Sequence, residues 1–319
     1  MKLIKPSFEI IEQKPRDIVI PADMEIGPQM WKEELINSVY RQIEMAGRTC
    51  YKSEDKITET SAKEFVDRMV KSGHGAMLEH GTVYLAIPLE YHCEDDDKVV
   101  DNWYEYECYE ENPYSETFVN YMNEFVYITT NYRVLVENNW LDDLQYICEP
   151  TEYHVKRVTV KFICDRGVSH EYVRHRVFSF AQESTRYCNY SKDKFGNELT
   201  CIIPNWLDLK DGSYSIKDVE EPYDRCLIID RCTNEEGAAF VRALCYAEKE
   251  YFHLIQLGWK PQQARAVLPN SLKTELVMTG TIEQWEGFFK LRDAGSAHPQ
   301  AYELAHPLHE EFIKRGWIK

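Results

Sequence analysis

Residues 174–187 read Arg174-His175-Arg176-Val177-Phe178-Ser179-Phe180-Ala181-Gln182-Glu183-Ser184-Thr185-Arg186-Tyr187. This stretch gathers three arginines, a histidine and two serines, whereas the whole chain of 319 residues carries a formal net charge of -17. Guanidinium groups pair with phosphate or carboxylate oxygens in a bidentate fork, so positive charge concentrated in an acidic protein predicts an anion-binding site. A solvated basic face with local salt bridges is the alternative interpretation.

The sequence before this stretch predicts the elements that carry it. Residues 158–163 alternate apolar and polar side chains like a half-buried strand, and a tight turn follows. Ser169 is expected to cap a helix of two or three turns. That helix would place three polar side chains on one face: Glu171, Arg174 and His175. An irregular loop after the helix would then adapt to a ligand that the rigid helix anchors.

The remaining chain predicts an α+β fold, with a modest, mostly antiparallel sheet flanked by long helices. A capping box of Ser61 and Glu64 begins one helix, and Gly47 is expected to end the helix before it. Helices are expected at 30–46, 61–72, 235–257, 281–290 and 299–314, and strands at 8–11, 82–87, 199–203 and 272–278.

Residues from about 91 to 155 differ in composition, because acidic side chains there are interleaved with tyrosines. We interpret this segment as an insertion in a single domain that spans 1–319. A strand or helix at 126–134 and a helix at 140–147 would fold part of it. Its acidity is interpreted as a solvated face and is assigned no chemistry.

Composition and absent motifs narrow the function. No Gly-x-Gly-x-x-Gly follows a predicted strand, no Walker A sequence exists, and Ser184 lacks the flanking glycines of a hydrolase elbow. The acidic balance argues against a nucleic-acid partner. No apolar run is long enough to span a bilayer, and residues 1–6 lack the apolar core of a signal peptide, so a cytoplasmic protein without a membrane partner is expected. The ten cysteines form no C-x-x-C pair, which predicts reduced thiols.

His74, Glu79 and His80 lie just before the strand expected at 82–87. Two histidines and a glutamate can ligate a metal, and they can equally be hydrogen-bonded structural residues. Because no third His or Cys lies at ligand spacing, we favour the structural interpretation and predict no metal site.

The spacing within residues 174–187 resembles the signature of the flavin-dependent thymidylate synthases: Arg-His-Arg, two residues, Ser, four residues, Ser, one residue, Arg. Residues 74–80, 258–269 and 291–298 are similar to three further segments of that family, in the same order. By this resemblance the chain is identified as a divergent member with an insertion.

The resemblance implies a flavin-dependent thymidylate synthase-like fold and the reductive methylation of dUMP to dTMP. It also implies FAD as cofactor, methylenetetrahydrofolate as one-carbon donor, and NADPH as the reductant of the flavin. A homotetramer with shared active sites would bind the pyrimidine nucleotide, and no partner among nucleic acids or membranes is implied.

Position by position, the resemblance also implies roles for residues. Ser184 and Arg186 would hold the nucleotide phosphate together with Arg265, and Arg292 would contact the pyrimidine. Three residues are expected to act in catalysis: Arg174, Ser184 and Arg292. The flavin would contact His74, Arg174, His175, Arg176 and His298. The substrate would contact Glu171, Arg174, Gln182, Glu183, Ser184, Arg186, Arg265 and Arg292.

The chain departs from the family pattern at several positions. The family usually has Asn-Glu where this chain has Ala181-Gln182, glutamine at Glu171 and threonine at Ala76. An amide at 182 both donates and accepts hydrogen bonds, which changes how a pyrimidine edge is recognised. One-carbon transfer to another pyrimidine nucleotide, such as dCMP, is therefore one alternative. A non-catalytic nucleotide- or nucleic-acid-binding module is another.

Overall fold

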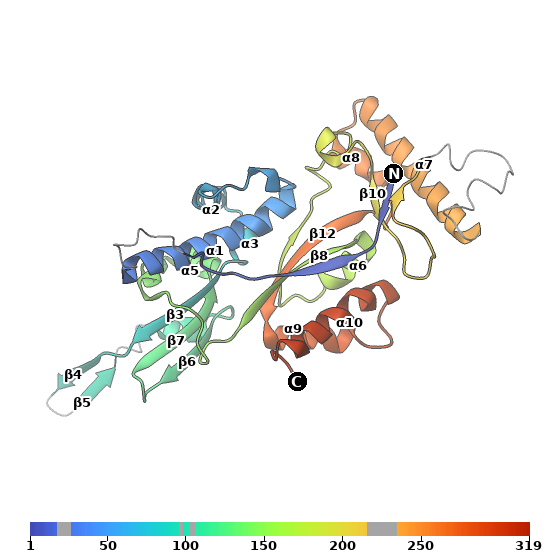
Figure 1. The fold of residues 1–319 in the computed structure, drawn as a ribbon. Coiled ribbons are helices and arrows are strands. Elements are labelled where there is room, and N and C mark those ends of the chain that lie inside the picture. The colour runs from blue at the N-terminus through green and yellow to red at the C-terminus, as the bar shows by residue number, and fades with distance from the viewer. Residues whose placement is uncertain (18–26, 96–97, 102–105, 216–234) are drawn as a thin grey trace.

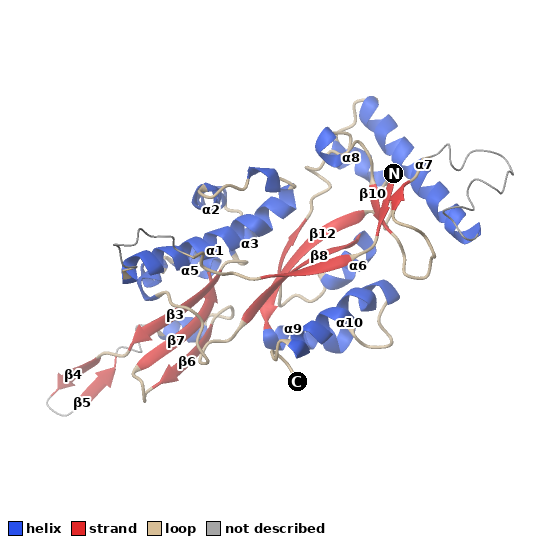
Figure 2. Cartoon of the chain, viewed as in Figure 1, coloured by secondary structure: helices blue, strands red, loops and turns tan. Residues whose placement is uncertain are grey.

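The computed structural model describes residues 1–17, 27–95, 98–101, 106–215 and 235–319. The molecule is elongated, with an arm of strands at one end and helix α7 (Glu235–Gln256) at the other (Figure 1). Helices and strands are mixed along the chain, which confirms the α+β class expected from the sequence (Figure 2).

The central sheet has four strands in the order β2-β8-β12-β9, and every neighbouring pair is antiparallel. The sequence predicted three of these strands, one of them from its apolar alternation, and the fourth lies inside the basic stretch. Their bounds are β2 (Ser7–Ile11), β8 (Arg157–Asp165), β9 (Ser179–Gln182) and β12 (Lys273–Thr281).

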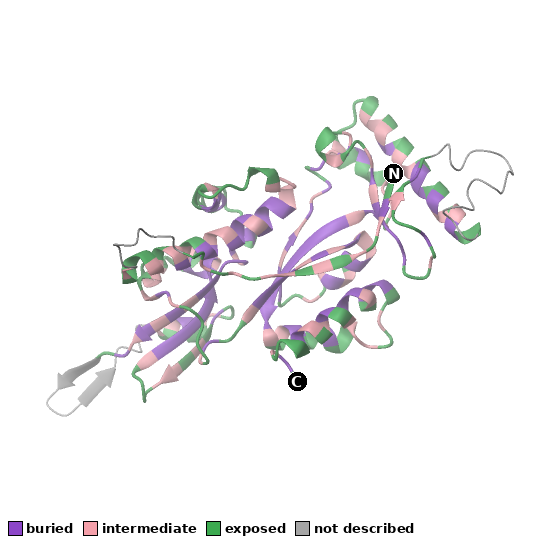
Figure 3. Cartoon of the chain, in the orientation of Figure 1, coloured by how far each residue is buried: buried purple, intermediate pink, exposed green. Residues whose placement is uncertain are grey.

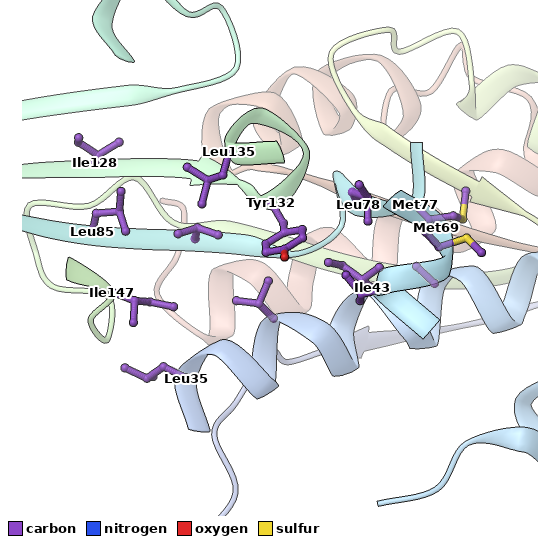
Figure 4. Close-up of a cluster of buried hydrophobic side chains, with 14 of the residues drawn as sticks. Leu35, Ile43, Met69, Met77, Leu78, Leu85, Ile128, Tyr132, Leu135 and Ile147 are labelled. Atoms are coloured by element: carbon purple, nitrogen blue, oxygen red, sulfur yellow. The ribbon is translucent and has the colours of Figure 1, made fainter. Parts of the chain in front are cut away.

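Two apolar clusters cover opposite faces of this sheet. On one face, Phe162 and Leu276 pack with residues of α9 (Ile282–Arg292) and α10 (Pro299–Lys314). On the other, Ala181 and Val277 join a larger cluster built on α1 (Pro28–Tyr51). Figure 4 shows part of that second cluster, and in Figure 3 the buried residues run along the central strands. The sheet is thus buried on both sides, which fixes the strands that carry the site.

A second sheet forms the arm, with the strand order β3-β7-β6 and antiparallel pairing throughout. The hairpin of β4 and β5 lies at its tip (Figure 1). The arm strands are β3 (Thr82–Pro88), β4 (Tyr91–Asp95), β5 (Lys98–Asp101), β6 (Glu116–Asn120) and β7 (Phe125–Asn131). That residues 91–155 are an insertion stays a prediction.

A third sheet pairs β1 with β10 in parallel and with β11 in antiparallel orientation. It packs beside α7 through an apolar cluster that contains Leu3, Cys201 and Leu244. Its strands are β1 (Lys2–Ile4), β10 (Thr200–Ile202) and β11 (Gly212–Ser213). The remaining helices are α2 (Ser61–Ser72), α3 (Gly75–Leu78), α4 (Glu107–Glu111), α5 (Tyr132–Asn138), α6 (Arg166–Tyr172), α8 (Pro261–Ala264) and the 3-10 turns η1 (Glu54–Lys56), η3 (Leu141–Tyr146), η4 (Asp193–Phe195) and η6 (Arg265–Val267).

Several local expectations were wrong. Helix α1 continues past Gly47 to Tyr51, because Gly47 lies against the Phe65 ring rather than in a terminating turn. Helix α2 has no side-chain cap, since the Ser61 hydroxyl hydrogen-bonds Glu44 instead. The helix expected at 140–147 is the shorter 3-10 turn η3, whose tighter winding replaces an α-helix there.

The cysteines whose side chains the structure describes are free thiols, as the sequence predicted: Cys50, Cys108, Cys148, Cys164, Cys188, Cys201 and Cys245. Within those same ranges, no helix combines the length and the apolar character needed to cross a bilayer.

Candidate active site

Helix α6 is held at its start by Asp165 rather than by the expected Ser169. The Asp165 Oδ1 atom accepts a hydrogen bond from Val168 N over 2.7 Å, which caps the helix. Its Oδ2 atom accepts from Gln300 Nε2 on α10 over 2.6 Å. Burial raises the pKa of the Asp165 carboxyl. The polar partners on both oxygens nevertheless tie the start of α6 to α10, so the residues after α6 leave from a fixed position.

Helix α6 ends at Tyr172, so Arg174 and His175 lie in the turn beyond it and not on the predicted helical face. The backbone nonetheless brings His175 and Glu171 together around Arg292, from the end of α9. The Arg292 Nη1 and Nη2 atoms donate to Oε2 and to the carbonyl oxygen of Glu171, over 2.5 and 2.8 Å. Arg292 Nε donates to His175 Nε2 over 3.0 Å. His175 and Glu171 precede Arg292 by 117 and 121 positions in the sequence, and the three residues form one hydrogen-bonded group.

His175 in this group is held neutral. Because Arg292 Nε can only donate, His175 Nε2 accepts, and the ring proton resides on Nδ1. Burial and the adjacent Arg292 cation lower the pKa of His175 to about 4. At neutral pH the group therefore contains one cation, one anion and a neutral imidazole.

Strand β9 places Gln182 toward α6. Its Nε2 atom donates to Ser169 Oγ over 2.8 Å and to Thr274 Oγ1 over 3.3 Å. No group in the described part of the chain donates to Gln182 Oε1. The side chain is half-buried, so it presents an acceptor oxygen near the Glu171 helix.

Glu183 is buried in an ion pair, at 2% exposure. Its Oε2 atom lies 2.8 Å from Lys273 Nζ, and its Oε1 atom accepts from the Tyr190 hydroxyl over 3.1 Å. The Glu183 carboxylate therefore has two protein partners. The nucleotide contact that we expected for Glu183 stays a prediction.

The loop after β9 brings Ser184, Arg186 and Arg265 to one place. Ser184 N donates to the Cys50 carbonyl oxygen over 3.0 Å, and its Oγ atom accepts from Arg186 N over 3.3 Å. Arg265, 80 positions further along the chain, donates from Nη1 to Thr185 Oγ1 over 3.2 Å. Arg265 therefore lies beside this loop, and the shared phosphate role that the resemblance implies stays a prediction.

His74 adjoins the same loop through two tyrosines. Its Nδ1 atom lies 3.2 Å from the Tyr51 hydroxyl, and the Tyr51 ring centroid lies 5.5 Å from that of Tyr187. Neither tyrosine was recognised as a site residue, because a tyrosine at the end of α1 and another in a loop give no chemical signal in the sequence. His298 lies apart from this loop, at the start of α10, with its ring centroid 5.9 Å from that of Trp206.

A buried charge cluster adjoins the loop through Lys273, which pairs with both Glu183 and Glu275. Glu275, at 6% exposure, pairs with Lys52, Lys161 and Lys273 over distances of 2.6 to 2.8 Å. Burial favours a neutral Glu275, but the lysine cations outweigh it and lower the pKa of its carboxyl far below the ordinary value. Sequence reasoning missed this cluster, whose members come from distant segments.

Four arginines at the site lack acidic partners. Arg174, Arg176, Arg186 and Arg265 are exposed, and none of them forms an ion pair with a carboxylate within the described ranges. Because the chain as a whole carries a large excess of acidic residues, four unpaired guanidinium groups favour the anion-binding interpretation over a solvated face of salt bridges.

The residues considered as metal ligands are separately bonded. His80 is fully buried, and its Nδ1 atom lies 2.8 Å from Thr279 Oγ1, whereas Glu79 pairs with Arg133 over 2.6 Å. Where side chains are described, no three His, Cys, Asp or Glu residues are grouped as metal ligands.

The family model described as thymidylate synthase complementing protein matches residues 149–315. The chain belongs to this family. The resemblance seen in the basic stretch is therefore confirmed, and the matched residues include every site residue discussed except those of the first half, such as His74.

This chain is similar to curated relatives over about half of its length. It is 28% identical to a flavin-dependent thymidylate synthase of Pyrococcus abyssi over 156 residues, which are 49% of this chain and 54% of the relative. It is 30% identical to a flavin-dependent thymidylate synthase of Corynebacterium glutamicum over 144 residues, 44% of this chain and 50% of the relative. The chain thus spans about half the length of the curated relatives it matches.

A solved structure similar to this family member is that of the UMP/dUMP methylase PolB from Streptomyces cacaoi bound with 5-Br dUMP. The alignment covers 98% of this chain and 93% of that chain, with 16% identity and a TM-score of 0.39.

Proposed function

We propose that the chain catalyses flavin-dependent reductive methylation of dUMP to dTMP. Methylenetetrahydrofolate would donate the one-carbon group and NADPH would reduce the cofactor, in a cytoplasmic homotetramer. The observation that carries the proposal is the set of four exposed arginines without acidic partners around the family's signature loop.

The site residues fit an FAD cofactor beside a nucleotide. Arg174 and Arg176 leave the end of α6 as exposed cations, which suits the pyrophosphate and the polar ring edge of a flavin. His74 and His298 are exposed as well, so both remain accessible to a cofactor. Bound reduced FAD would supply the hydride for the reaction.

The nucleotide phosphate would lie at the loop that Arg186, Arg265 and Ser184 form. Two guanidinium groups balance a phosphate dianion, and the Ser184 hydroxyl can donate to it. Arg292 would then contact the pyrimidine carbonyl, where its fixed cation stabilises negative charge that develops on the ring during attack on the methylene carbon. His175 orients Arg292 through the hydrogen bond that it accepts from Nε. Because His175 is neutral, it does not compete with Arg292 for a bound anion.

Gln182 motivates a second candidate substrate. Its free Oε1 atom can accept from N3–H of a uracil ring or from the amino group of a cytosine ring. One-carbon transfer to dCMP therefore remains open as the alternative activity. Turnover assays that compare dUMP with dCMP, under the same folate and NADPH, separate the two; activity on dCMP alone would reject the dUMP assignment.

The visible spectrum of the purified protein after addition of FAD tests the redox chemistry itself. We expect a bound-flavin spectrum that bleaches on addition of NADPH. If the protein binds dUMP but neither binds flavin nor oxidises NADPH, it is a nucleotide-binding module rather than an enzyme of this class.

A further inference from the structure

A basic pocket of about 520 Å³ opens beside the candidate active site. Tyr51 forms one wall, and the same residue contacts His74 and Tyr187 of the site. The charged residues that line the pocket are Arg48, Asp55, Lys56, Arg68, Lys192 and Lys194. Five cations line this pocket against one carboxylate, whereas the chain as a whole carries a net charge of -17.

Most of the positive charge in the pocket is uncompensated. Arg48 is the exception, because it pairs with buried Glu44 over 2.9 Å. Arg68 lies over the Phe65 ring, 5.5 Å from its centroid, and the Arg48 guanidinium lies 4.8 Å from the same centroid. For Lys56, Arg68, Lys192 and Lys194, no ion pair with a carboxylate occurs within the described ranges. Lys194 Nζ donates one hydrogen bond to the Lys52 carbonyl oxygen over 3.0 Å, which leaves its charge unneutralised. The four positive charges can therefore attract an anionic ligand.

The spread of the cations indicates the kind of anion. They come from α2, η1 and the residues at η4, and three of the four are lysines, which act as flexible point charges rather than bidentate forks. A single phosphate needs donors that converge on one point. Cations on separate walls of a pocket suit a flexible chain of separated carboxylates instead.

We propose that this pocket binds the oligo-γ-glutamyl tail of the folate donor, with the folate ring system toward Tyr51 and His74. The inference rests on the proposed function for the identity of the ligand. Folate carries a glutamate whose γ-carboxylate can be extended by further glutamates, and each added residue brings one more carboxylate. Affinity for the donor should then rise with tail length and fall with added salt.

Calorimetric titration of tetraglutamyl and monoglutamyl folate against the full chain tests the pocket without requiring turnover. We expect the tetraglutamyl form to bind at least about tenfold more tightly to the wild type, which corresponds to one to two modest ion pairs. The double variant Arg68→Gln/Lys192→Gln should bind both forms alike. Its matched control, Lys63→Gln/Lys71→Gln, changes two exposed lysines on α2 that do not line the pocket, and it should keep the preference.

Equal affinity of the wild type for both forms would overturn the proposal, as would a preference that survives in Arg68→Gln/Lys192→Gln. Thermal unfolding of each variant shows that it is folded; should the double variant unfold, the single variants Arg68→Gln and Lys192→Gln, each expected to reduce the preference, decide in its place. A tail-length preference in a protein without flavin-dependent turnover would reject the proposed activity and still support the pocket.

Discussion

Arg292 Nη1 lies 2.5 Å from Glu171 Oε2, so the cation proposed to contact the pyrimidine already has an anionic partner. This ion pair is half-buried, and Glu171 stands where the family resemblance predicts a glutamine. The carboxylate keeps Arg292 in place, but its negative charge also opposes the binding of a nucleotide dianion at the site.

Replacing Glu171 by glutamine should therefore strengthen nucleotide binding. Glu171→Gln keeps an acceptor for Arg292 and removes the repulsion, and one charge at several ångströms is worth about 1 kcal/mol, or roughly fivefold in the dUMP dissociation constant. Isothermal titration calorimetry at low salt measures the change. Glu286→Gln, an exposed site on the same helix α9 as Arg292, is the control and should leave affinity unchanged. Weaker binding by Glu171→Gln would contradict the charge argument.

The lowered pKa of His175 should appear as a pH dependence of stability. The folded pKa of about 4 lies below the ordinary histidine value of 6.5, so the unfolded chain binds the proton more tightly. Protonation then favours unfolding, and the free energy of unfolding should fall as pH drops from about 6.5 to about 4. Above that window His175 contributes no penalty.

Denaturant unfolding at pH 7 and pH 4.5 measures this effect against His175→Gln, whose amide oxygen can still accept from Arg292. The loss of stability between the two pH values should be smaller in the variant than in the wild type. An NMR titration of the His175 ring protons gives its pKa directly, and a value near 6.5 would show that the imidazole is not held neutral.

Arg186→Ala should weaken nucleotide binding and leave flavin binding nearly intact. Loss of one charge-assisted bond to phosphate costs about 1.5–3 kcal/mol, roughly a tenfold to hundredfold rise in the dUMP dissociation constant. Arg174→Ala, at the end of α6, is expected to weaken both ligands. Separate titrations with FAD and dUMP distinguish the two, with exposed Arg242→Ala on α7 as the control. Unchanged dUMP affinity in Arg186→Ala would reject its phosphate role.

The sequence predicted best those elements whose causes are local. Thr281 and Gln284 form the expected capping box, with reciprocal bonds of 2.9 and 3.2 Å at the start of α9. Gly258 ends α7 with a φ of 93°, a conformation that glycine adopts without strain. Both signals lie within a few residues of the feature that they determine, so no knowledge of the tertiary fold was needed.

Features that depend on distant contacts were missed. Lys52 and Glu275 are 223 positions apart, and no periodicity in either segment reveals that they meet. Asp165 rather than Ser169 caps α6, because both residues can cap and only the packing against Gln300 on α10 distinguishes them. The resemblance named Glu171, Arg265 and Arg292 as site residues, and their roles stay predictions. It gave no account of the buried cluster around Glu275.

The buried cluster should tolerate loss of its central anion poorly. Glu275→Gln would leave Lys52, Lys161 and Lys273 together without their shared carboxylate, which we expect to cost about 3–5 kcal/mol of the free energy of unfolding. Because the pKa of Glu275 is lowered, its stabilisation is present above the ordinary value and is lost as pH falls below it. Chemical denaturation measures the loss, and exposed Glu283→Gln should change stability little. If Glu275→Gln left the free energy of unfolding almost unchanged, the three lysines would have to pair with other groups.

Gly47 tests how packing against Phe65 outweighs the helix-ending signal of a glycine. A Cβ atom at this position would lie 2.3 Å from Phe65 Cζ, so the glycine allows α2 to approach α1. Gly47→Ala should therefore destabilise the protein by about 1–3 kcal/mol, although alanine favours a helix intrinsically. Gly287→Ala is the matched control, because this glycine lies inside α9 with no atom within 4 Å of the added Cβ, and it should stabilise by about 0.5–1 kcal/mol. Denaturant titration of both variants measures the opposite signs. Phe65→Leu in the Gly47→Ala background should recover part of the loss if the clash with the ring is its cause.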